Sequence, residues 1–249
     1  MSSGLKVTYL FHSGYLVKVS ETLLIFDFYS DPQNRDQREK NINRVQSAIL
    51  DPDILRVFVF ASHNHRDHFD RDILNFDRFG KPVRYVFSSD INAGADKEHL
   101  HVMSPDQSAN IEDLTVQTYG STDQGVSFLI SLKSFTLFHA GDLNWWHWFD
   151  ESTEEELEMY EHDFKAIIRT IGQPAIDIAF FPVDPRLKAF DYYGGAYFIE
   201  VLRPRYFFPM HFGYDYQTTE RFKQQIANLG LSAQVFVIQE EGQTFTLND

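Results

Sequence analysis

An apolar run of buried-strand length, R-V-F-V-F-A-S at residues 56–62, leads directly into the polar segment H-N-H-R-D-H at residues 63–68. A short apolar run without alternation is typical of a strand that is covered on both faces of its sheet. Such a strand needs a layered fold with a large core. Loops at strand ends are also where a rigid scaffold presents functional groups, so this loop is the first candidate for a functional site.

Three histidines and one aspartate fall within the six residues after this strand. His63 and His65 can point to the same side of an extended loop, and Asp67 and His68 follow after a further turn. One metal ion does not readily take four ligands from so short a segment. We therefore predict two neighbouring metal ions, the first on His63 and His65 and the second on Asp67 and His68. The alternative is a solvated polar loop that is rich in histidine.

The chain of 249 residues has no cysteine. This excludes disulfides, a thiol nucleophile, iron–sulfur clusters and thiolate zinc sites. Any metal must be held by histidine, carboxylate or backbone oxygen. The formal net charge of −14 argues against nucleic-acid binding, because counterion release needs a basic face.

Two later strand ends present similar chemistry. F-H-A-G-D at residues 138–142 ends in Asp142, whose two oxygens can bridge two cations, whereas His139 is expected to be a core or supporting residue. F-F-P-M-H-F-G at residues 207–213 ends a strand at His211, which we expect to be a further metal ligand.

Taken together, H-x-H-x-D-H, then G-D, then a late strand-end histidine resemble the metallo-β-lactamase superfamily over essentially the whole chain. The segments T-Y-L-F-H-S-G-Y-L-V, L-I-F-D-F-Y-S-D-P and F-H-A-G-D are similar to the branch that includes ascorbate-phosphate lactonase-like hydrolases. The resemblance implies an α+β fold, a four-layer αββα sandwich of two mixed β-sheets flanked by helices, with a dinuclear site at one edge of the sheets. We predict a single domain over residues 1–249.

The resemblance also implies how the ligands are shared. His63 and His65 would bind the first metal, Asp67, His68 and His211 the second, and Asp142 would bridge them.

One family histidine is missing before the strand G-V-S-F-L-I, where the sequence reads Y-G-S-T-D-Q-G at residues 119–125. Ser121 stands where that histidine commonly lies, and Asp123, two residues on, is the better ligand. We predict that Asp123 completes the first site. The alternative is that Asp123 is an ordinary turn residue beside Gly125 and that the first metal is weak or absent.

The predicted activity is that of a metal-dependent hydrolase that uses a metal-bound hydroxide to cleave a small-molecule ester, lactone, amide or phosphoester. Asp67 and Asp142 are the predicted catalytic residues, which take or pass the proton. We expect two divalent metal ions, zinc first, with manganese or iron as alternatives. The competing hypotheses are a nuclease or phosphodiesterase of the same fold, redox chemistry on iron, and a degenerate metal-binding protein without turnover.

Substrate recognition is predicted for Trp145, Asp184, Arg186 and Tyr193, which follow strand ends or precede a glycine pair. Arg186 could clamp a carboxylate or phosphate, with a surface salt bridge as the alternative. Trp145, Trp146 and Trp148 could wall a pocket or pack under a helix. The expected partner is a small-molecule substrate, without nucleic acid or membrane. The chain has no basic leader with an apolar run and no membrane-spanning stretch, so we expect a soluble cytoplasmic protein.

Hydrophobic patterning predicts the following elements. Strands are expected at 5–10, 14–19, 22–28, 56–62, 83–88, 113–119, 125–131, 134–140, 176–181, 205–209, 235–239 and 243–247, and helices at 42–50, 151–171, 194–202 and 217–229. Residues 31–40 are predicted to be a loop, and residues 89–112 to be irregular.

Overall fold

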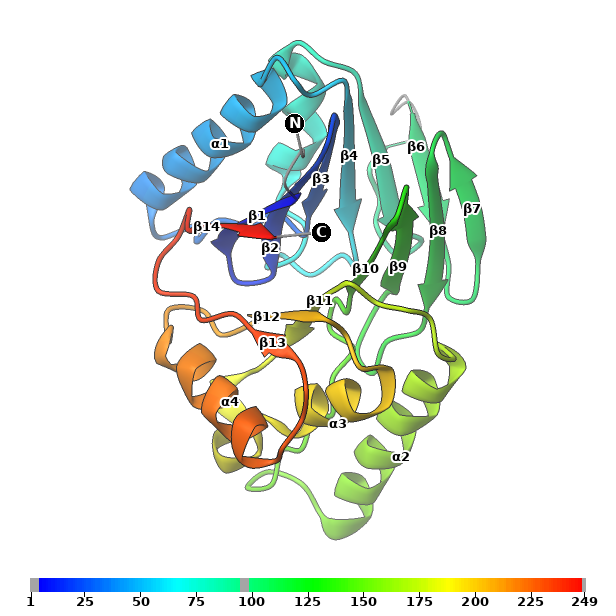
Figure 1. Cartoon of the computed structure of the whole chain (residues 1–249), viewed down its shortest axis with the longest axis vertical. Helices are drawn as coiled ribbons and strands as arrows, with labels where there is room; N and C mark the ends of the chain where they lie inside the picture. The colour runs from blue at the N-terminus through cyan, green and yellow to red at the C-terminus, as the bar shows by residue number, and fades with distance from the viewer. Residues whose placement is uncertain (1–4, 95–98, 248–249) are drawn as a thin grey trace. The chain divides into compact units, whose positions relative to one another are not determined.

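The computed structural model describes residues 5–94 and 99–247, and the chain divides into two compact units. The first unit comprises Met1–Met103 and Glu240–Asp249, and the second comprises Ser104–Gln239. Each unit is built on one mixed seven-stranded sheet with helices (Figure 1). The prediction of two mixed sheets flanked by helices is thereby confirmed, whereas the prediction of a single domain stays a prediction.

The sheet of the first unit combines an antiparallel half with a parallel half. In pairing order its strands are β14 (Thr244–Leu247), β1 (Leu5–Phe11), β2 (Gly14–Val19), β3 (Thr22–Phe26), β4 (Arg56–Ala61), β5 (Val83–Ser88) and β6 (Leu100–Met103). Pairing is antiparallel from β14 to β3 and parallel from β3 to β6. The carboxyl ends of the parallel strands therefore meet at one edge, where functional groups gather in open sheets of this kind.

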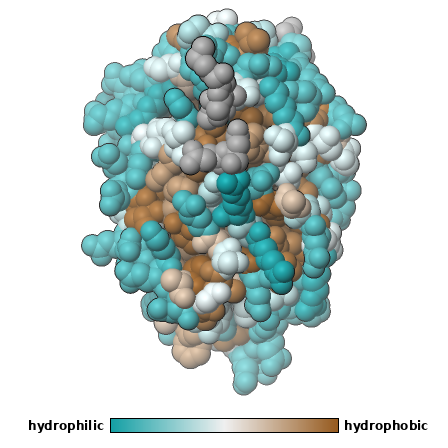
Figure 2. Space-filling view, in the orientation of Figure 1, coloured by the Kyte–Doolittle hydropathy of each residue, from teal (hydrophilic) through white to brown (hydrophobic). Residues whose placement is uncertain are grey.

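Two helices cover this sheet, α1 (Arg35–Leu50) and the 3₁₀ helix η1 (Arg71–Phe79). Val45 and Ile49 of α1, with Ile73 and Phe76 of η1, are buried in one apolar cluster with side chains of β3, β4 and β5. The outer side of α1 is polar, and the part of the surface that α1 occupies is coloured hydrophilic in Figure 2. This amphipathic pattern explains why α1 lies on the sheet.

The sheet of the second unit has the same two halves. In pairing order its strands are β13 (Gln234–Val235), β12 (Tyr206–Met210), β11 (Ile178–Pro182), β10 (Phe135–His139), β9 (Ser127–Leu132), β8 (Leu114–Tyr119) and β7 (Ser108–Ile111). Pairing is parallel from β13 to β10 and antiparallel from β10 to β7. Its helices are α2 (Glu154–Thr170), the 3₁₀ helix η2 (Pro185–Phe190), α3 (Tyr193–Leu202) and α4 (Gln217–Asn228).

Phenylalanine side chains pack these helices against the sheet. Phe207 of β12 lies 5.0 Å, centroid to centroid, from Phe222 of α4 and 6.5 Å from Phe198 of α3. Phe164 of α2 meets Phe181 of β11 edge to face at 6.2 Å. Aromatic pairs at these separations add to the burial of their large apolar surfaces, so the abundance of phenylalanine has a structural explanation.

Most predicted strands and helices are found within a few residues of their expected bounds, but four predictions need correction. Helix α1 begins at Arg35 and not at residue 42. The sequence pattern did not show its first two turns because the polar residues Gln37 and Asn41 form the buried face there. These buried polar side chains hide the helical spacing that Val45 and Ile49 reveal. The helix start is marked instead by Asn34, whose side chain accepts a hydrogen bond from the backbone N–H of Gln37.

The other corrections concern short elements. The segment 89–112, predicted as irregular, contains the edge strands β6 and β7, although its residues 95–98 lie outside the described part. The 3₁₀ helices η1 and η2 were not predicted, and the strand expected at 235–239 is found only as the two-residue β13, Gln234–Val235. Short strands at the sheet edge carry polar residues because one face meets solvent, so their hydrophobic pattern is weak. In the described part of the chain, no helix combines the length and the apolar character needed to cross a bilayer.

Candidate metal centre

The histidines that follow β4 lie together at the carboxyl end of that strand. The ring centroid of His63 is 4.6 Å from that of His65 and 4.2 Å from that of His68. The loop closes through hydrogen bonds from the backbone N–H groups of His68 and Phe69 to the carbonyl oxygen of His65, at 3.1 and 2.9 Å. This turn brings His68 back beside His63, so three imidazoles share one small region of the first unit.

Asp27, at the end of β3, fixes two of these imidazoles. Its carboxylate is fully buried and accepts hydrogen bonds from the backbone N–H of Ser62 (2.8 Å), from Ser62 Oγ (2.6 Å) and from Nδ1 of His68 (2.7 Å). Because the Ser62 hydroxyl donates its single proton to Asp27, Oγ accepts from Nδ1 of His63 at 3.0 Å. Both rings therefore carry their proton on Nδ1 and keep a lone pair on Nε2. A histidine that ligates a metal has this arrangement.

Asp67 lies beside His12, a residue of the turn after β1. The Oδ2 atom of Asp67 is 3.4 Å from Nε2 of His12, and the His12 and His68 ring centroids are 5.7 Å apart. Ligand-type atoms of His12, Asp67 and His68 all lie within 4.8 Å of one another. His12 also has a positive φ of 55°, which is uncommon for a residue other than glycine and is concentrated at functional sites.

In the second unit, Asp142 and His211 lie side by side at the ends of β10 and β12. Oδ1 of Asp142 is 3.3 Å from Nε2 of His211, and both residues are almost fully buried. Nδ1 of His211 donates to Oδ2 of Asp184 at 2.9 Å, which again leaves the lone pair of the ring on Nε2. His211 has a positive φ of 67°. A third imidazole is thus oriented by a buried carboxylate.

The carboxylate of Asp184 stays ionised by its own contacts. Burial raises its pKa, but hydrogen bonds from His211 and Arg186 outweigh burial and bring the pKa of Asp184 to about 2. Nε of Arg186 lies 3.0 and 2.9 Å from the two oxygens. Asp184 and Arg186 were both predicted to contact substrate. In the structure the Asp184 carboxylate contacts His211, and Arg186 forms an ion pair with the same carboxylate.

Asp123, the predicted replacement for the missing histidine, lies near Asp142 in the second unit. Its carboxylate offers an oxygen within 4.8 Å of one from Asp142, and its side chain is exposed. The loops are tied together by Thr122, whose Oγ1 donates to the carbonyl oxygen of Asn144 (2.7 Å) and accepts from the Asn144 backbone N–H (3.0 Å). This tie gives a local reason why Asp123 is held beside Asp142.

The tryptophans that follow Asp142 divide between two roles. Trp145 stacks on Phe164 of α2 at 6.3 Å and lies 5.1 Å from Tyr193. Trp145 and Tyr193 also line a cavity of about 350 Å³, so Trp145 both packs under the helix and walls a pocket. Trp146 instead contacts the predicted ligands: its Nε1 donates to the carbonyl oxygen of Asp142 at 3.0 Å, and its ring lies 5.6 Å from His211.

His139 is fully buried and supports the turn that carries Asp142. Its Nδ1 accepts a hydrogen bond from the backbone N–H of Gly141 at 3.2 Å. The structure thus agrees with the expectation of a core or supporting residue.

The sequence interpretation missed Asp27. The available signal was an aspartate that directly ends the apolar strand T-L-L-I-F. Only the parallel pairing of β3 with β4 shows that Asp27 reaches Ser62 and His68.

No protein-family model matches the chain, and no curated protein sequence matches it. Solved structures do match. Igni18, a metallo hydrolase from the archaeon Ignicoccus hospitalis, has a TM-score of 0.67 at 20% identity and covers 99% of this chain and 100% of its own. The metallo-β-lactamase fold protein YhfI from Bacillus subtilis has a TM-score of 0.60 at 13% identity, with 98% and 99% covered. The chain has the metallo-β-lactamase fold.

This metallo-β-lactamase fold also carries other chemistry. CmlA, a diiron β-hydroxylase from Streptomyces venezuelae, matches with a TM-score of 0.58 at 14% identity, over 98% of this chain and 53% of its own. Because one fold serves several reactions, the activity has to be argued from the residues.

The residues fit a divalent metal. The donors in each unit are imidazole nitrogens and carboxylate oxygens, a set that suits zinc, manganese or iron. Imidazoles in both units are oriented by buried carboxylates, as metal ligation requires.

Proposed function

We propose that this chain is a metal-dependent hydrolase that cleaves an ester, lactone, amide or phosphoester bond in a small molecule. The observation that carries the proposal is the orientation of three imidazoles, on His63, His68 and His211, by hydrogen bonds that lead to Asp27 or Asp184. A histidine buried for packing alone does not need its Nδ1–H held by a charged carboxylate. The proposed ligands of two divalent ions are His63, His65, Asp67, His68, Asp123, Asp142 and His211.

The chemistry divides between the metals and the protein. A bound divalent metal lowers the pKa of a coordinated water to about 7 and polarises an acceptor oxygen. Asp67 and Asp142 are proposed to accept and return the proton. Nε2 of His12 lies 3.4 Å from Oδ2 of Asp67, which places an imidazole beside this carboxylate. Asp27 and Asp184 keep the imidazole protons on Nδ1 throughout.

A small-molecule substrate is favoured over a nucleic acid. The net charge of −14 opposes the phosphate contacts that dominate nucleic-acid affinity. Zinc is the proposed metal, with manganese and iron as alternatives. We also propose that the protein works in the cytoplasm, where proteins without disulfides are common.

Metal content and turnover test this proposal together. The purified protein is analysed by inductively coupled plasma mass spectrometry, stripped with a chelator, reconstituted, and assayed on p-nitrophenyl esters, lactones, amides and phosphoesters. We expect about two divalent ions per chain and turnover that the chelator abolishes and the metal restores. The variants His63→Ala and His211→Ala should each lose metal, whereas His162→Ala, an exposed histidine of α2, should not.

The alternatives predict different results. A degenerate protein would fold normally, retain metal poorly and turn over no substrate in the panel. A nuclease would bind RNA tightly and in a salt-dependent manner. Metal content unchanged in both His63→Ala and His211→Ala would refute the proposed ligand set.

A further inference from the structure

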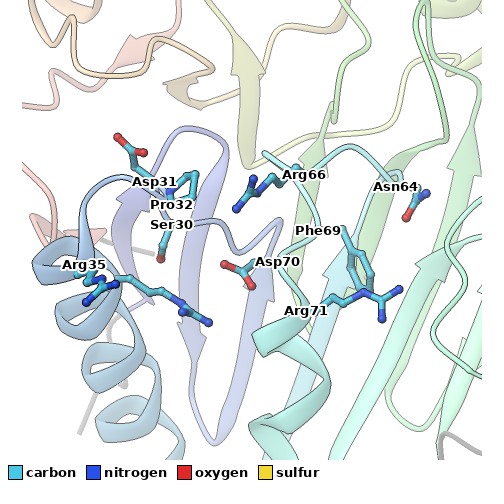
Figure 3. A pocket seen from close by; sticks show the side chains of 10 residues that line it. Ser30, Asp31, Pro32, Arg35, Asn64, Arg66, Phe69, Asp70 and Arg71 are labelled. Carbon is cyan, nitrogen blue, oxygen red and sulfur yellow. The ribbon is translucent and has the colours of Figure 1, made fainter.

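The first unit contains a cavity of about 620 Å³ that is lined by four arginines, Arg35, Arg38, Arg66 and Arg71. Two aspartates, Asp31 and Asp70, line it as well, so the formal charge of the lining is positive in a chain of net charge −14. Figure 3 shows the guanidinium group of Arg66 extending toward Ser30 and Pro32, with the carboxylate of Asp70 between Arg66 and helix α1. The Arg71 side chain extends the other way, beside Phe69 and on the side of Asn64.

Three of the four arginines form no ion pair within the described residues, although the charge of Arg66 acts on the nearby carboxylate of Asp70. Arg38 pairs with Asp72, its Nε at 2.8 Å and its terminal nitrogen at 2.6 Å from the carboxylate. Across residues 5–94 and 99–247, no ion pair is found for Arg35, Arg66 or Arg71.

The two aspartates of the lining are engaged in local turns. Asp31 accepts from the backbone N–H of Gln33 at 2.9 Å, and Asp70 accepts from the backbone N–H of Asp72 at 3.0 Å. Both carboxylates remain in the lining, where the four arginines exceed them by two formal charges.

Two helices begin at this cavity. Arg35 is the first residue of α1 and Arg71 is the first residue of η1, and Figure 3 shows both helices starting beside the hollow. A helix N-terminus carries partial positive charge, so a cation there is unfavourable for the helix itself. Arginine at the first position of both helices thus has no explanation in helix stability. The same position favours an anion that arginine and backbone N–H groups bind together.

A buried hydroxyl completes the lining. Ser30 is 2% exposed, and its Oγ makes no hydrogen bond with any described residue. A buried hydroxyl without a partner is costly unless a ligand supplies one. Phe69, almost fully buried, provides an apolar wall, and Asn64 a further polar group.

We infer that this cavity binds a phosphorylated small molecule, with its phosphate held by Arg35, Arg66 and Ser30 and its organic portion extending past Phe69 toward Arg71. Planar guanidinium groups, helix N-termini and a hydroxyl are the donors that phosphate groups use in proteins. The volume leaves room for an organic portion beside Phe69. Asn64 and Arg66 line the cavity, whereas His63, His65 and Asp67, which alternate with them in sequence, do not. The proposed phosphate site is therefore separate from the proposed metal ligands, and the inference does not rest on the proposed hydrolase activity.

Calorimetry with a matched pair of ligands tests this inference. Phenylphosphonate and benzoate share an aromatic ring and differ in the anion, and inorganic phosphate serves as the minimal probe. We expect phenylphosphonate to bind the intact chain and benzoate to bind at least about tenfold more weakly, because it lacks the second charge and the third oxygen. Binding should be the same in metal-replete and metal-depleted protein.

Variants identify the site. Arg35→Gln and Arg66→Gln should each weaken binding of phenylphosphonate by about tenfold or more, and Ser30→Ala by about fivefold. Arg78→Gln, at an exposed arginine of helix η1 outside the lining, removes the same charge and should leave the affinity unchanged. His63→Ala should also leave it unchanged. Circular dichroism confirms that each variant folds.

Three results would overturn the inference. The first is no binding of phosphate or phenylphosphonate to the wild-type chain at millimolar concentration. The second is equal weakening by Arg66→Gln and Arg78→Gln, which would mean a general effect of charge. The third is binding that disappears with the metal or in His63→Ala but persists in the arginine variants, which would place the phosphate at the proposed metal ligands.

Discussion

Replacing Asp27 by asparagine should break metal binding while leaving the first unit folded. The carboxylate Oδ1 accepts from the backbone N–H of Ser62 at 2.8 Å, and Oδ2 accepts from Ser62 Oγ at 2.6 Å and from His68 Nδ1 at 2.7 Å. In Asp27→Asn the amide oxygen must face the Ser62 backbone N–H, because the opposite orientation would set two donors against each other. The amide NH₂ group then faces His68 and the Ser62 hydroxyl.

This orientation reverses the proton positions of two imidazoles. Nδ1 of His68 must accept from the new NH₂ group, so its ring proton moves to Nε2. The Ser62 hydroxyl also accepts from the NH₂ group and turns its own proton toward Nδ1 of His63, 3.0 Å away. Both rings then carry a proton on the nitrogen that a metal needs, which is the wrong tautomer for ligation.

The expected loss can be given a magnitude. Removing one carboxylate that orients a ligating histidine lowers metal affinity by about 10–100-fold, which corresponds to about 1.4–2.7 kcal/mol. Because Asp27 acts on two histidines, we expect the upper part of this range. The variant keeps the shape of the side chain and every hydrogen-bonding position, so the free energy of unfolding of the metal-free protein should fall by only about 0.5–1.5 kcal/mol.

The assay is a titration of metal-free protein with zinc in competition with a chromophoric chelator, paired with urea unfolding of the same samples. Asp51→Asn is the matched control, since Asp51 also accepts two hydrogen bonds in the first unit, from Lys18 and from the backbone of Asp53, but contacts no histidine. The control should bind zinc like the wild type. Wild-type zinc affinity in a folded Asp27→Asn variant would refute the tautomer argument.

Three further predictions concern the second unit. Asp123→Ala should lower the metal content from two ions to one by mass spectrometry, and no change in content would show that Asp123 is an ordinary turn residue. Burial raises the pKa of Asp191 to about 6, with Asp184 and Asp215 adding to it and Arg221 opposing. Because this pKa lies above the unfolded value of about 3.9, the folded state binds the extra proton between the two values and loses stability as pH rises through that window. A shift of about two pKa units corresponds to about 3 kcal/mol, and solvent screening of the partly exposed carboxyl reduces this to about 1 kcal/mol. Asp191→Asn should therefore stabilise the protein above pH 7 by about 1 kcal/mol and leave it unchanged near pH 4, and equal gains at both pH values in urea unfolding would contradict this. Gly195→Ala would place a Cβ 2.7 Å from the Phe222 ring and should cost about 1–3 kcal/mol, whereas Gly120→Ala, with its nearest contact at 3.8 Å, should be tolerated; similar melting temperatures for the two would disprove the packing argument.

The sequence by itself determined the class of fold and the chemical character of the candidate site. Apolar runs that end in His63, Asp142 and His211 indicate strands that deliver ligand-type residues to sheet edges, and this information is local to each segment. The absence of cysteine restricts the donors to imidazole and carboxylate, and composition alone shows this.

The tertiary structure decided what depends on strand pairing. Asp27 orients His68 only because β3 lies parallel beside β4, and Asp184 orients His211 only because β11 lies parallel beside β12. The residues of each pair are 41 and 27 positions apart, so no local pattern joins them. Likewise, Arg35, Arg66 and Arg71 form one cavity only because α1, η1 and the loop after β4 converge on the same part of the first unit.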